Sequence, residues 1–255
     1  MKPPRVSVVI PVYNRAELVA QAIGSVQRQE GVEVDILVAD DGSTDETAAA
    51  VAALAMSDNR IQLIRGHNGG PAAARNRAVA VARGDYLAFL DSDDLIPPGR
   101  LRRQIGKLER RPDVVAVIGT VLGFEALNSD GEPEPHPAHR PFYNLALHCA
   151  TFRREYFLEL GPLDESLIFG EDIDLFLRLF ETDARMILEA EIGSYYRHHA
   201  GNMVHHTTAR QHGYAKAYAR SLRRRRAAGH IRPVRSFFRH PVQGDVDFCG
   251  REATA

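Results

Sequence analysis

The sequence predicts an α/β fold, with a mostly parallel central sheet, helices on both faces and a basic helical extension at the C-terminus. Short β-branched apolar runs alternate with segments of helical periodicity over the first 95 residues. Short connections between them are typical of strand–helix–strand units. Charge is divided unevenly: residues 192–255 hold 12 Lys and Arg against 3 Asp and Glu, and residues 1–191 hold 20 against 30. The two parts are therefore expected to face different partners.

The first half of the chain is predicted to contain four strands separated by three helices. The strands are "RVSVVIPVYN" (5–14), "VDILVAD" (34–40), "IQLI" (61–64) and "DYLAFL" (85–90). Asn14 with Glu17, and Ser43 with Glu46, form the spacing of capping boxes before the first two helices. Pro71 suits the first position of the third helix, "PAAARNRAVAVAR".

The second half is less regular. A basic helix at 98–111 and a strand at 113–124 come first. Residues 128–141 are rich in proline and turn formers, which predicts a mobile loop. Helices are expected at 152–161, 171–181 and 207–228, and extended segments at 184–190 and 193–199.

Composition indicates a globular protein of the cytoplasm. The chain has 255 residues and no apolar run near the roughly 20 residues that a membrane-spanning helix needs. It has two cysteines, Cys149 and Cys249, and its N-terminus lacks the apolar core of a signal peptide. A chain of this length can fold as one α/β domain with an appendage.

Carboxylates gather where two predicted strands end. Asp91 and Asp93 follow "YLAF" two residues apart, so extended backbone places both on the same side. Such oxygen ligands suit Mg²⁺ or Mn²⁺, although an acidic turn can also be a solvated loop. Asp40 and Asp41 end another strand; one could cap the next helix while the other accepts a hydrogen bond from a nucleobase. Ligands bind at this edge of open α/β sheets.

Two further segments have metal-binding or acid–base chemistry. "GEDIDLFLRL" (170–179) places Glu171 and Asp172 in a first helical turn, where acids also complement the helix dipole. "YYRHHAGNMVHH" (195–206) holds histidines that are either surface residues or metal ligands. Neither a G-x-G-x-x-G after the first strand nor a P-loop motif occurs, so dinucleotide-binding and P-loop functions lack their motifs.

These segments together resemble the family 2 glycosyltransferases, which have the GT-A fold with a Rossmann-like sheet. "VSVVIPVYN", "VADDGSTD", "HNGGPAAARN", "YLAFLDSDD", "GPLDESLIFGEDIDLFLRL" and "YRHHAGNM" occur in the family's order, from residue 5 to about 204. The resemblance implies a glycosyltransferase domain over 1–204, with a nucleotide-binding half (1–95) and an acceptor half (96–204). Residues 205–255 would be the basic helical extension.

The resemblance also implies roles for single residues. The metal, Mn²⁺ or Mg²⁺, would be bound by Asp91, Asp93 and His199. The adjacent His198 could take the place of His199, so the choice between these two histidines stays open. The nucleotide would be bound by Pro11, Tyr13, Asp41, Arg75, Asp91 and Ser92. Pro11 and Tyr13 would line the pocket, Asp41 would meet the base, and Arg75 would approach the nucleotide or diphosphate.

The implied reaction moves a sugar from a nucleotide diphosphate to an acceptor hydroxyl with inversion. UDP is the expected nucleotide because most relatives use it, and GDP and dTDP sugars stay open. Asp172 would be the general base, and Phe169 and Glu171 would contact the acceptor. Many members have an aromatic residue shortly before "ED"; Phe169 is the one candidate here. The acceptor would be a glycan or a lipid-linked molecule, as in cell-envelope polysaccharide synthesis.

Other interpretations stay open at this point. A nucleotidyltransferase also joins an α/β sheet to acidic metal ligands, but it would leave the "ED" and "YRxH" segments unexplained. A non-catalytic nucleotide-sugar binding module is the other alternative, and an assay for released nucleotide would separate it from an enzyme. The basic extension could contact the inner face of an anionic membrane peripherally, or it could dock on the acidic body of the protein. Nucleic-acid binding is less favoured because no recognition motif accompanies the charge.

Overall fold

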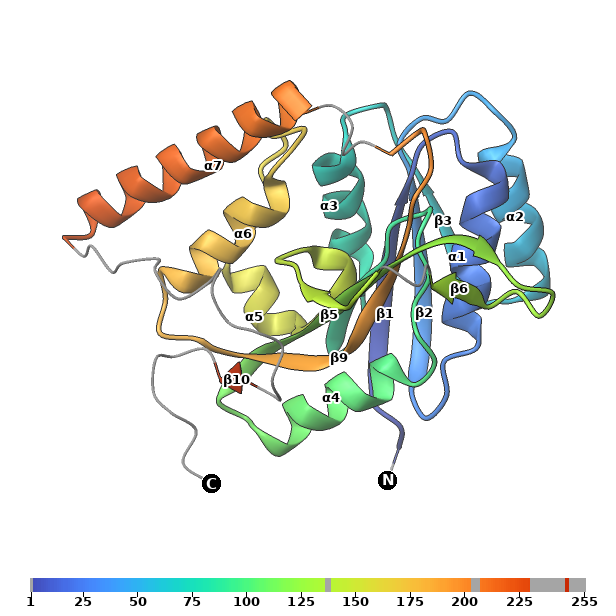
Figure 1. Cartoon of the computed structure of the whole chain (residues 1–255), viewed down its shortest axis with the longest axis horizontal. Helices are drawn as coiled ribbons and strands as arrows, with labels where there is room; N and C mark the ends of the chain where they lie inside the picture. Colours follow the sequence, from blue (N-terminus) through green and yellow to red (C-terminus); the bar gives the residue numbers. More distant parts are fainter. Residues whose placement is uncertain (1, 136–138, 203–206, 230–245, 248–255) are drawn as a thin grey trace.

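The structure is a computed structural model, and it describes residues 2–135, 139–202, 207–229 and 246–247. The elements of the first half are β1 (Arg5–Val12), α1 (Ala16–Gln27), β2 (Glu33–Asp40), α2 (Thr47–Ser57), β3 (Ile61–Arg65), α3 (Pro71–Val81), β4 (Tyr86–Phe89) and α4 (Arg100–Arg110). Those of the second half are β5 (Val114–Leu127), β6 (Pro133–Pro135), β7 (Phe142–Tyr143), η1 (Leu147–Cys149), β8 (Ala150–Arg153), α5 (Arg154–Glu159), α6 (Glu171–Phe180), β9 (Arg185–Arg197), α7 (Thr207–Ala227) and β10 (Val246–Asp247). Figure 1 shows the central strands between α3, α5 and α6 on one side and α1 and α2 on the other, with the last long helix, α7, on the outside of α6.

One mixed sheet forms the centre of the described structure, in the order β10-β9-β5-β8-β4-β1-β2-β3. Strands β1 to β4 pair in parallel, as the alternation of strands and helices predicted. Strand β8 lies antiparallel between β4 and β5, and β9 continues parallel to β5. Because β1, β2 and β4 are parallel and adjacent, their carboxyl ends meet at one edge of the sheet, where ligands bind in folds of this class.

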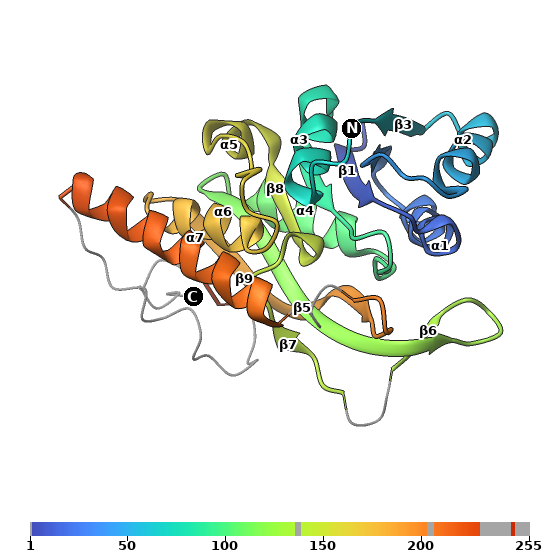
Figure 2. The same cartoon turned by 90° about the horizontal axis from the view of Figure 1, so that it is seen from above.

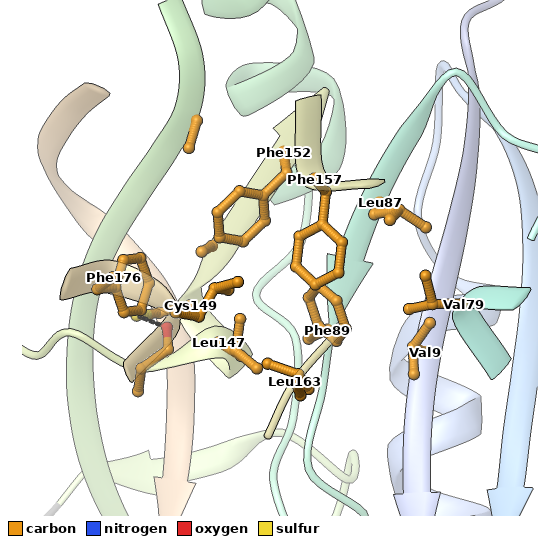
Figure 3. Close-up of a cluster of buried hydrophobic side chains, with 14 of the residues drawn as sticks. Val9, Val79, Leu87, Phe89, Leu147, Cys149, Phe152, Phe157, Leu163 and Phe176 are labelled. Carbon is orange, nitrogen blue, oxygen red and sulfur yellow. Dashed lines mark hydrogen bonds between the residues drawn. The ribbon is translucent and has the colours of Figure 1, made fainter. Parts of the chain in front are cut away.

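Alternate residues of the strands face two separate cores. In β1, Val9 packs into a core shared with α3, α5 and α6, and Val8 and Ile10 pack into one shared with α1, α2 and α4. Figure 3 shows the first core, where the rings of Phe89, Phe152 and Phe157 lie together; the Phe89 and Phe157 ring centroids are 5.2 Å apart. Helices therefore cover both faces, as predicted.

The second half differs from the sequence prediction in three places. The helix predicted at 152–161 begins only at Arg154, because Phe152 and Arg153 belong to β8, which pairs with β4 and β5. Residues 133–135 of the predicted loop form β6, which extends the sheet by pairing with the far end of β5; residues 136–138 lie outside the described residues. The two extended segments predicted after residue 184 are one continuous strand, β9. The residues between them belong to that strand because β5 is 14 residues long and pairs with β9 along most of its length.

The two predicted capping boxes are wrong. Asn14 adopts a φ of 50°, and its side-chain oxygen accepts a hydrogen bond from the Thr44 backbone at 2.8 Å. Ser43 accepts from the Asn14 backbone at 2.9 Å, so these side chains tie the loop after β1 to the loop after β2. The helix starts are satisfied otherwise: Thr47 Oγ1 accepts the Arg15 N–H, and Asp45 accepts the Thr47 N–H. Pro71 does occupy the first turn of α3, as predicted.

Helix α7 confirms the long helix predicted in the basic extension, and it docks on the body of the protein. Figures 1 and 2 both show α7 lying beside α6. Ala217 is fully buried with Leu167 and Leu177, and Arg224 pairs with Asp174 at 2.9 Å and with Glu181 at 2.7 Å. The rest of the extension, apart from β10, lies outside the described residues. Among the helices that the structure describes, none combines the length and the hydropathy needed to cross a membrane.

Candidate active site

The three acids after β4 point in different directions. Asp94 is 1% exposed; it accepts a hydrogen bond from the Arg197 backbone at 3.0 Å and lies 2.8 Å from His148 Nδ1. Burial raises the pKa of Asp94 to about 7, because the charged form loses its hydration. The side chains of Asp91 and Asp93 are 33% and 21% exposed. Asp94 is therefore an internal residue of this turn, and Asp91 and Asp93 remain reachable by a ligand.

Arg75 of α3 links the acids after β4 to those that begin α6. Its guanidinium donates to Asp91 at 2.7 Å and to Glu171 at 2.7 Å, and its side chain is only 8% exposed. Burial disfavours the charge on Asp91, but Arg75 and His148 outweigh it and hold the pKa of Asp91 below its usual range. The Arg75–Glu171 ion pair joins residues 96 positions apart in the sequence. It fixes Glu171 beside Asp91-Ser92-Asp93, the D-x-D segment.

Asp172 stands next to this bridge without being part of it. One of its oxygens accepts the Ile173 N–H at 2.7 Å, and among the described residues it makes no ion pair. Burial raises the pKa of Asp172, and the same effect, with the neighbouring Asp172 charge, raises the pKa of Glu171 to about 7. A partly exposed carboxylate with raised proton affinity, held in place by a paired neighbour, suits a general base.

His199 lies against Asp93, and His198 does not. His199 Nε2 is 3.1 Å from Asp93 Oδ2. The His198 ring instead packs at a tilt against His139 and edge-on against Tyr196, with ring centroids 4.9 and 5.1 Å away. Two adjacent ligands of an octahedral cation at about 2.1 Å would be separated by about 3.0 Å. The spacing of Asp93 and His199 therefore fits ligation of one Mg²⁺ or Mn²⁺.

A second group of possible metal ligands lies deeper. Asp91, Asp94 and His148 each offer one ligand atom, and these atoms lie within 4.8 Å of one another. Asp94 and His148 are 1% and 4% exposed and already face each other. A metal shared with a substrate must be reached by that substrate, so Asp93 and His199 are better placed.

Three of the predicted nucleotide ligands, Pro11, Tyr13 and Asp41, lie at the ends of β1 and β2. Pro11 is buried in β1, and Tyr13 just beyond it is 43% exposed. Asp41 accepts hydrogen bonds from the Gly69 and Gly70 backbone and from Arg77, and so ties the end of β2 to the loop before α3. Neither Asp40 nor Asp41 caps α2, contrary to one alternative from the sequence, because Asp40 accepts from Ser43 and Arg65. An open hollow beside this edge is lined by Gly42, Arg65, Gly66, His67 and Asn68.

The remaining predicted residues flank these groups. Ser92 is buried between the two reachable acids, at 8% exposure. Phe169 is half-buried two residues before Glu171. Two features were missed by the sequence analysis: His148, which lies in a short 3-10 turn without a recognisable motif, and a contact between α7 and this region. Gly213 was the available signal for that contact, because a glycine inside a helix costs about 1 kcal/mol relative to alanine and usually has a packing reason.

The mixed, mostly parallel sheet with helices on both faces is the GT-A fold, and two solved structures of glycosyltransferases share this fold. One is the mannosyltransferase PcManGT from Pyrobaculum calidifontis in complex with GDP-Man and Mn²⁺, with a TM-score of 0.65 at 21% identity, covering 87% of this chain and 66% of that one. Another is S. aureus TarS in complex with UDP-GlcNAc, with a TM-score of 0.61 at 21% identity, covering 79% and 60%.

The chain belongs to glycosyl transferase family 2, whose family model matches residues 7–161. The succinoglycan biosynthesis protein ExoO of Rhizobium meliloti is 35% identical over 225 residues, which is 79% of this chain and 63% of ExoO. The glycosyltransferase GlyG of Streptococcus pneumoniae is 32% identical over 49% of this chain and 41% of its own length. The chain thus spans less than two thirds of these relatives.

Proposed function

We propose that this chain transfers a sugar from a nucleotide diphosphate, preferably UDP, to a hydroxyl of a glycan or lipid-linked acceptor, with inversion. Residues 1–95 would bind the nucleotide, residues 96–204 would bind the acceptor, and 205–255 would be an extension. The UDP-GlcNAc and GDP-Man complexes of similar folds support the donor class. The name of ExoO supports a polysaccharide pathway.

In the proposed reaction the acceptor oxygen attacks the anomeric carbon, and the bond from that carbon to the diphosphate oxygen breaks. Asp172 takes the acceptor proton, and the nucleoside diphosphate leaves with the electron pair. A bound Mn²⁺ or Mg²⁺, held by Asp93 and His199 with Asp91 nearby, would stabilise the negative charge on the leaving diphosphate. Arg75 fixes the position of the acids on both sides of the reacting centre.

The Arg75 bridge is the observation that best supports this function, since it joins the D-x-D acids to the helix that presents Asp172. A screen of UDP-, GDP- and dTDP-sugars, with and without Mn²⁺, tests it by thermal shift and by release of nucleoside diphosphate. A ligand at 100 times its dissociation constant stabilises the folded state by about 2.7 kcal/mol. Stabilisation without release would favour the binding module, and release of pyrophosphate from a nucleoside triphosphate would favour the nucleotidyltransferase.

Replacing the proposed metal ligand should remove the metal dependence of nucleotide binding. In Asp93→Ala, His199 loses the carboxylate that lies 3.1 Å away, so Mn²⁺ should no longer tighten UDP binding in calorimetric titration. The matched control is Asp130→Ala, an exposed acid in the loop after β5. An unchanged Mn²⁺ effect in Asp93→Ala would remove this residue from the metal site.

We also propose that α7 contacts anionic membranes peripherally through the arginines that do not pair with the body. Arg224 is occupied by Asp174 and Glu181, whereas Arg223 and Arg226 are exposed. Each basic residue near an anionic surface contributes about 1 kcal/mol, so Arg223→Gln/Arg226→Gln should weaken liposome binding by about 30-fold.

Co-sedimentation with liposomes that contain anionic lipid, at rising salt, measures this effect. Arg83→Gln/Arg110→Gln removes the same charge from exposed positions outside α7 and is the control. Binding to neutral liposomes that matches binding to anionic ones would contradict an electrostatic contact.

A further inference from the structure

Helix α7 approaches the segment before Asp172 more closely than any residue except glycine would allow. A Cβ placed on Gly213 would collide with the carbonyl oxygen of Phe169. A Cβ on Gly170 would lie 3.2 Å from the Gly213 carbonyl carbon, and Gly170 has a φ of 84°, which also favours glycine. Two glycines thus let the extension pack backbone to backbone against the residues that lead into α6.

This contact brings Tyr214 to the beginning of α6. Its Cδ1 lies 3.0 Å from the position that a Cβ of Gly170 would occupy, and Gly170 directly precedes Glu171 and Asp172. The side chain is 37% exposed, so one part rests on the protein and another part can meet a ligand. Burial raises the pKa of Tyr214, and the charges of Asp172 and Glu171 raise it further, which agrees with the contact at Gly170.

Tyr218 lies one turn later on the same helix and is almost equally exposed, at 38%. Burial alone raises its pKa, with no contribution from Asp172 or Glu171. Tyr214 lies against Gly170, at the start of α6, and no such contact is found for Tyr218 among the glycine neighbours of the described residues, so Tyr218 serves as the matched control of equal exposure. The helix itself is held by the buried Ala217 and by Arg224, so Tyr214 is placed on a fixed surface.

We infer that Tyr214 forms a wall of the acceptor site, with its ring against the apolar face of a pyranose acceptor whose hydroxyl points at Asp172. An aromatic ring with a polar end suits a sugar. The ring packs on the C–H groups of the sugar, and the phenol hydroxyl stays in water or forms a hydrogen bond with a sugar hydroxyl. Phe169, the aromatic candidate from the sequence, is half-buried, with its backbone and Cβ against Gly213. This role rests on the proposed function of Asp172 as the base.

The test uses the full chain with UDP and Mn²⁺, and octyl pyranosides of glucose, galactose, mannose and N-acetylglucosamine as acceptor probes. Saturation-transfer NMR measures the dissociation constant of each probe in the parent, Tyr214→Ala, Tyr214→Phe and Tyr218→Ala proteins. We expect Tyr214→Ala to weaken the best probe by about 3- to 10-fold, from the usual worth of an aromatic contact. Tyr214→Phe should restore most of this loss, and Tyr218→Ala should match the parent.

Equal probe binding by Tyr214→Ala and the parent, or no binding of any pyranoside to the parent, would overturn the role of Tyr214. Calorimetric titration of UDP with Mn²⁺ keeps that result separate from the proposed function. A parent protein that does not bind UDP in the presence of Mn²⁺ would refute the proposed donor site. UDP binding that is the same in all variants, with unchanged probe binding, would refute the role of Tyr214 alone.

Discussion

Sugar transfer should fall by about 10²-fold or more in Asp172→Asn, with the affinity for UDP and Mn²⁺ staying within a few-fold of the parent. Asparagine keeps the size of the side chain and can still accept the Ile173 N–H, which Asp172 accepts at 2.7 Å. What it loses is the ability to take a proton. The rate of product formation at saturating donor, together with calorimetric titration of UDP, measures the two quantities separately.

The pH profile of the parent protein gives a second readout of the same residue. Burial raises the pKa of Asp172, so its base form is lost at a higher pH than for an ordinary aspartate. The acid limb of the rate profile should therefore lie above the usual range of an aspartate. Asp174→Asn is the control, since this residue pairs with Arg178 and Arg224 and lies 2% exposed. Full transfer activity in Asp172→Asn, with the same linkage in the product, would leave Asp172 as a residue of the first helical turn only.

Removing the bridging arginine should cause the largest loss of stability. Arg75→Met leaves the buried Glu171 without its cation and also removes the partner of Asp91. Breaking a buried ion pair from one side typically costs about 3–5 kcal/mol. Urea unfolding of the variant should show this cost at pH 8, and Arg77→Met on the same helix should lose much less, because Asp41 keeps its two backbone donors.

The loss in Arg75→Met should shrink as the pH falls. Burial and Asp172 already raise the pKa of Glu171 to about 7, and loss of Arg75 raises it further. The folded state then holds a proton that the unfolded state, with an ordinary glutamate pKa, releases above about 4.5. Up to about pH 7 both proteins hold this proton, so both lose stability alike as the pH rises from about 5. Above about 7 the parent releases the proton and forms the Arg75–Glu171 ion pair, whereas the variant still holds it, so the deficit is larger at pH 8 than at pH 5.

Glu171→Gln combined with Arg75→Met should recover part of the lost stability, because it removes the unpaired carboxylate. A cost below about 1 kcal/mol for Arg75→Met at pH 8 would mean that the bridge contributes little to the fold. No recovery in the double variant would mean that the loss comes from packing of the long side chain rather than from its charge.

The sequence predicted most elements because their signals are local. Strand and helix periodicity depends on neighbours within a few residues, and it placed β1 to β4, α1 to α3 and α7 close to where the structure has them. The prediction of two capping boxes was wrong because it, too, used only local sequence. Asn14 and Ser43 have the local pattern of caps, but the loops after β1 and β2 lie side by side, and the two residues bond across that gap.

The candidate site could be predicted only as a set of residues. The members at the ends of β1, β2 and β4 meet because these strands are parallel neighbours, whereas Arg75 comes from α3, Asp172 from α6 and His199 from the turn after β9. The sequence could not decide between His198 and His199 as the neighbour of Asp93. The turn after β9 does so, because the Asn202 side chain accepts the His199 N–H at 2.6 Å and His198 pairs through its backbone with Phe124.

By itself the sequence determined the α/β class, the acidic edge, the family and the helix in the basic extension. Tertiary structure alone decided that Arg75 joins Asp91 to Glu171, that Asp94 turns inward to His148, and that Gly213 brings Tyr214 to the start of α6. The physical reason is distance along the chain. Periodicity and turn chemistry report on residues a few positions apart, whereas a contact across 96 residues depends on how whole helices pack on the sheet.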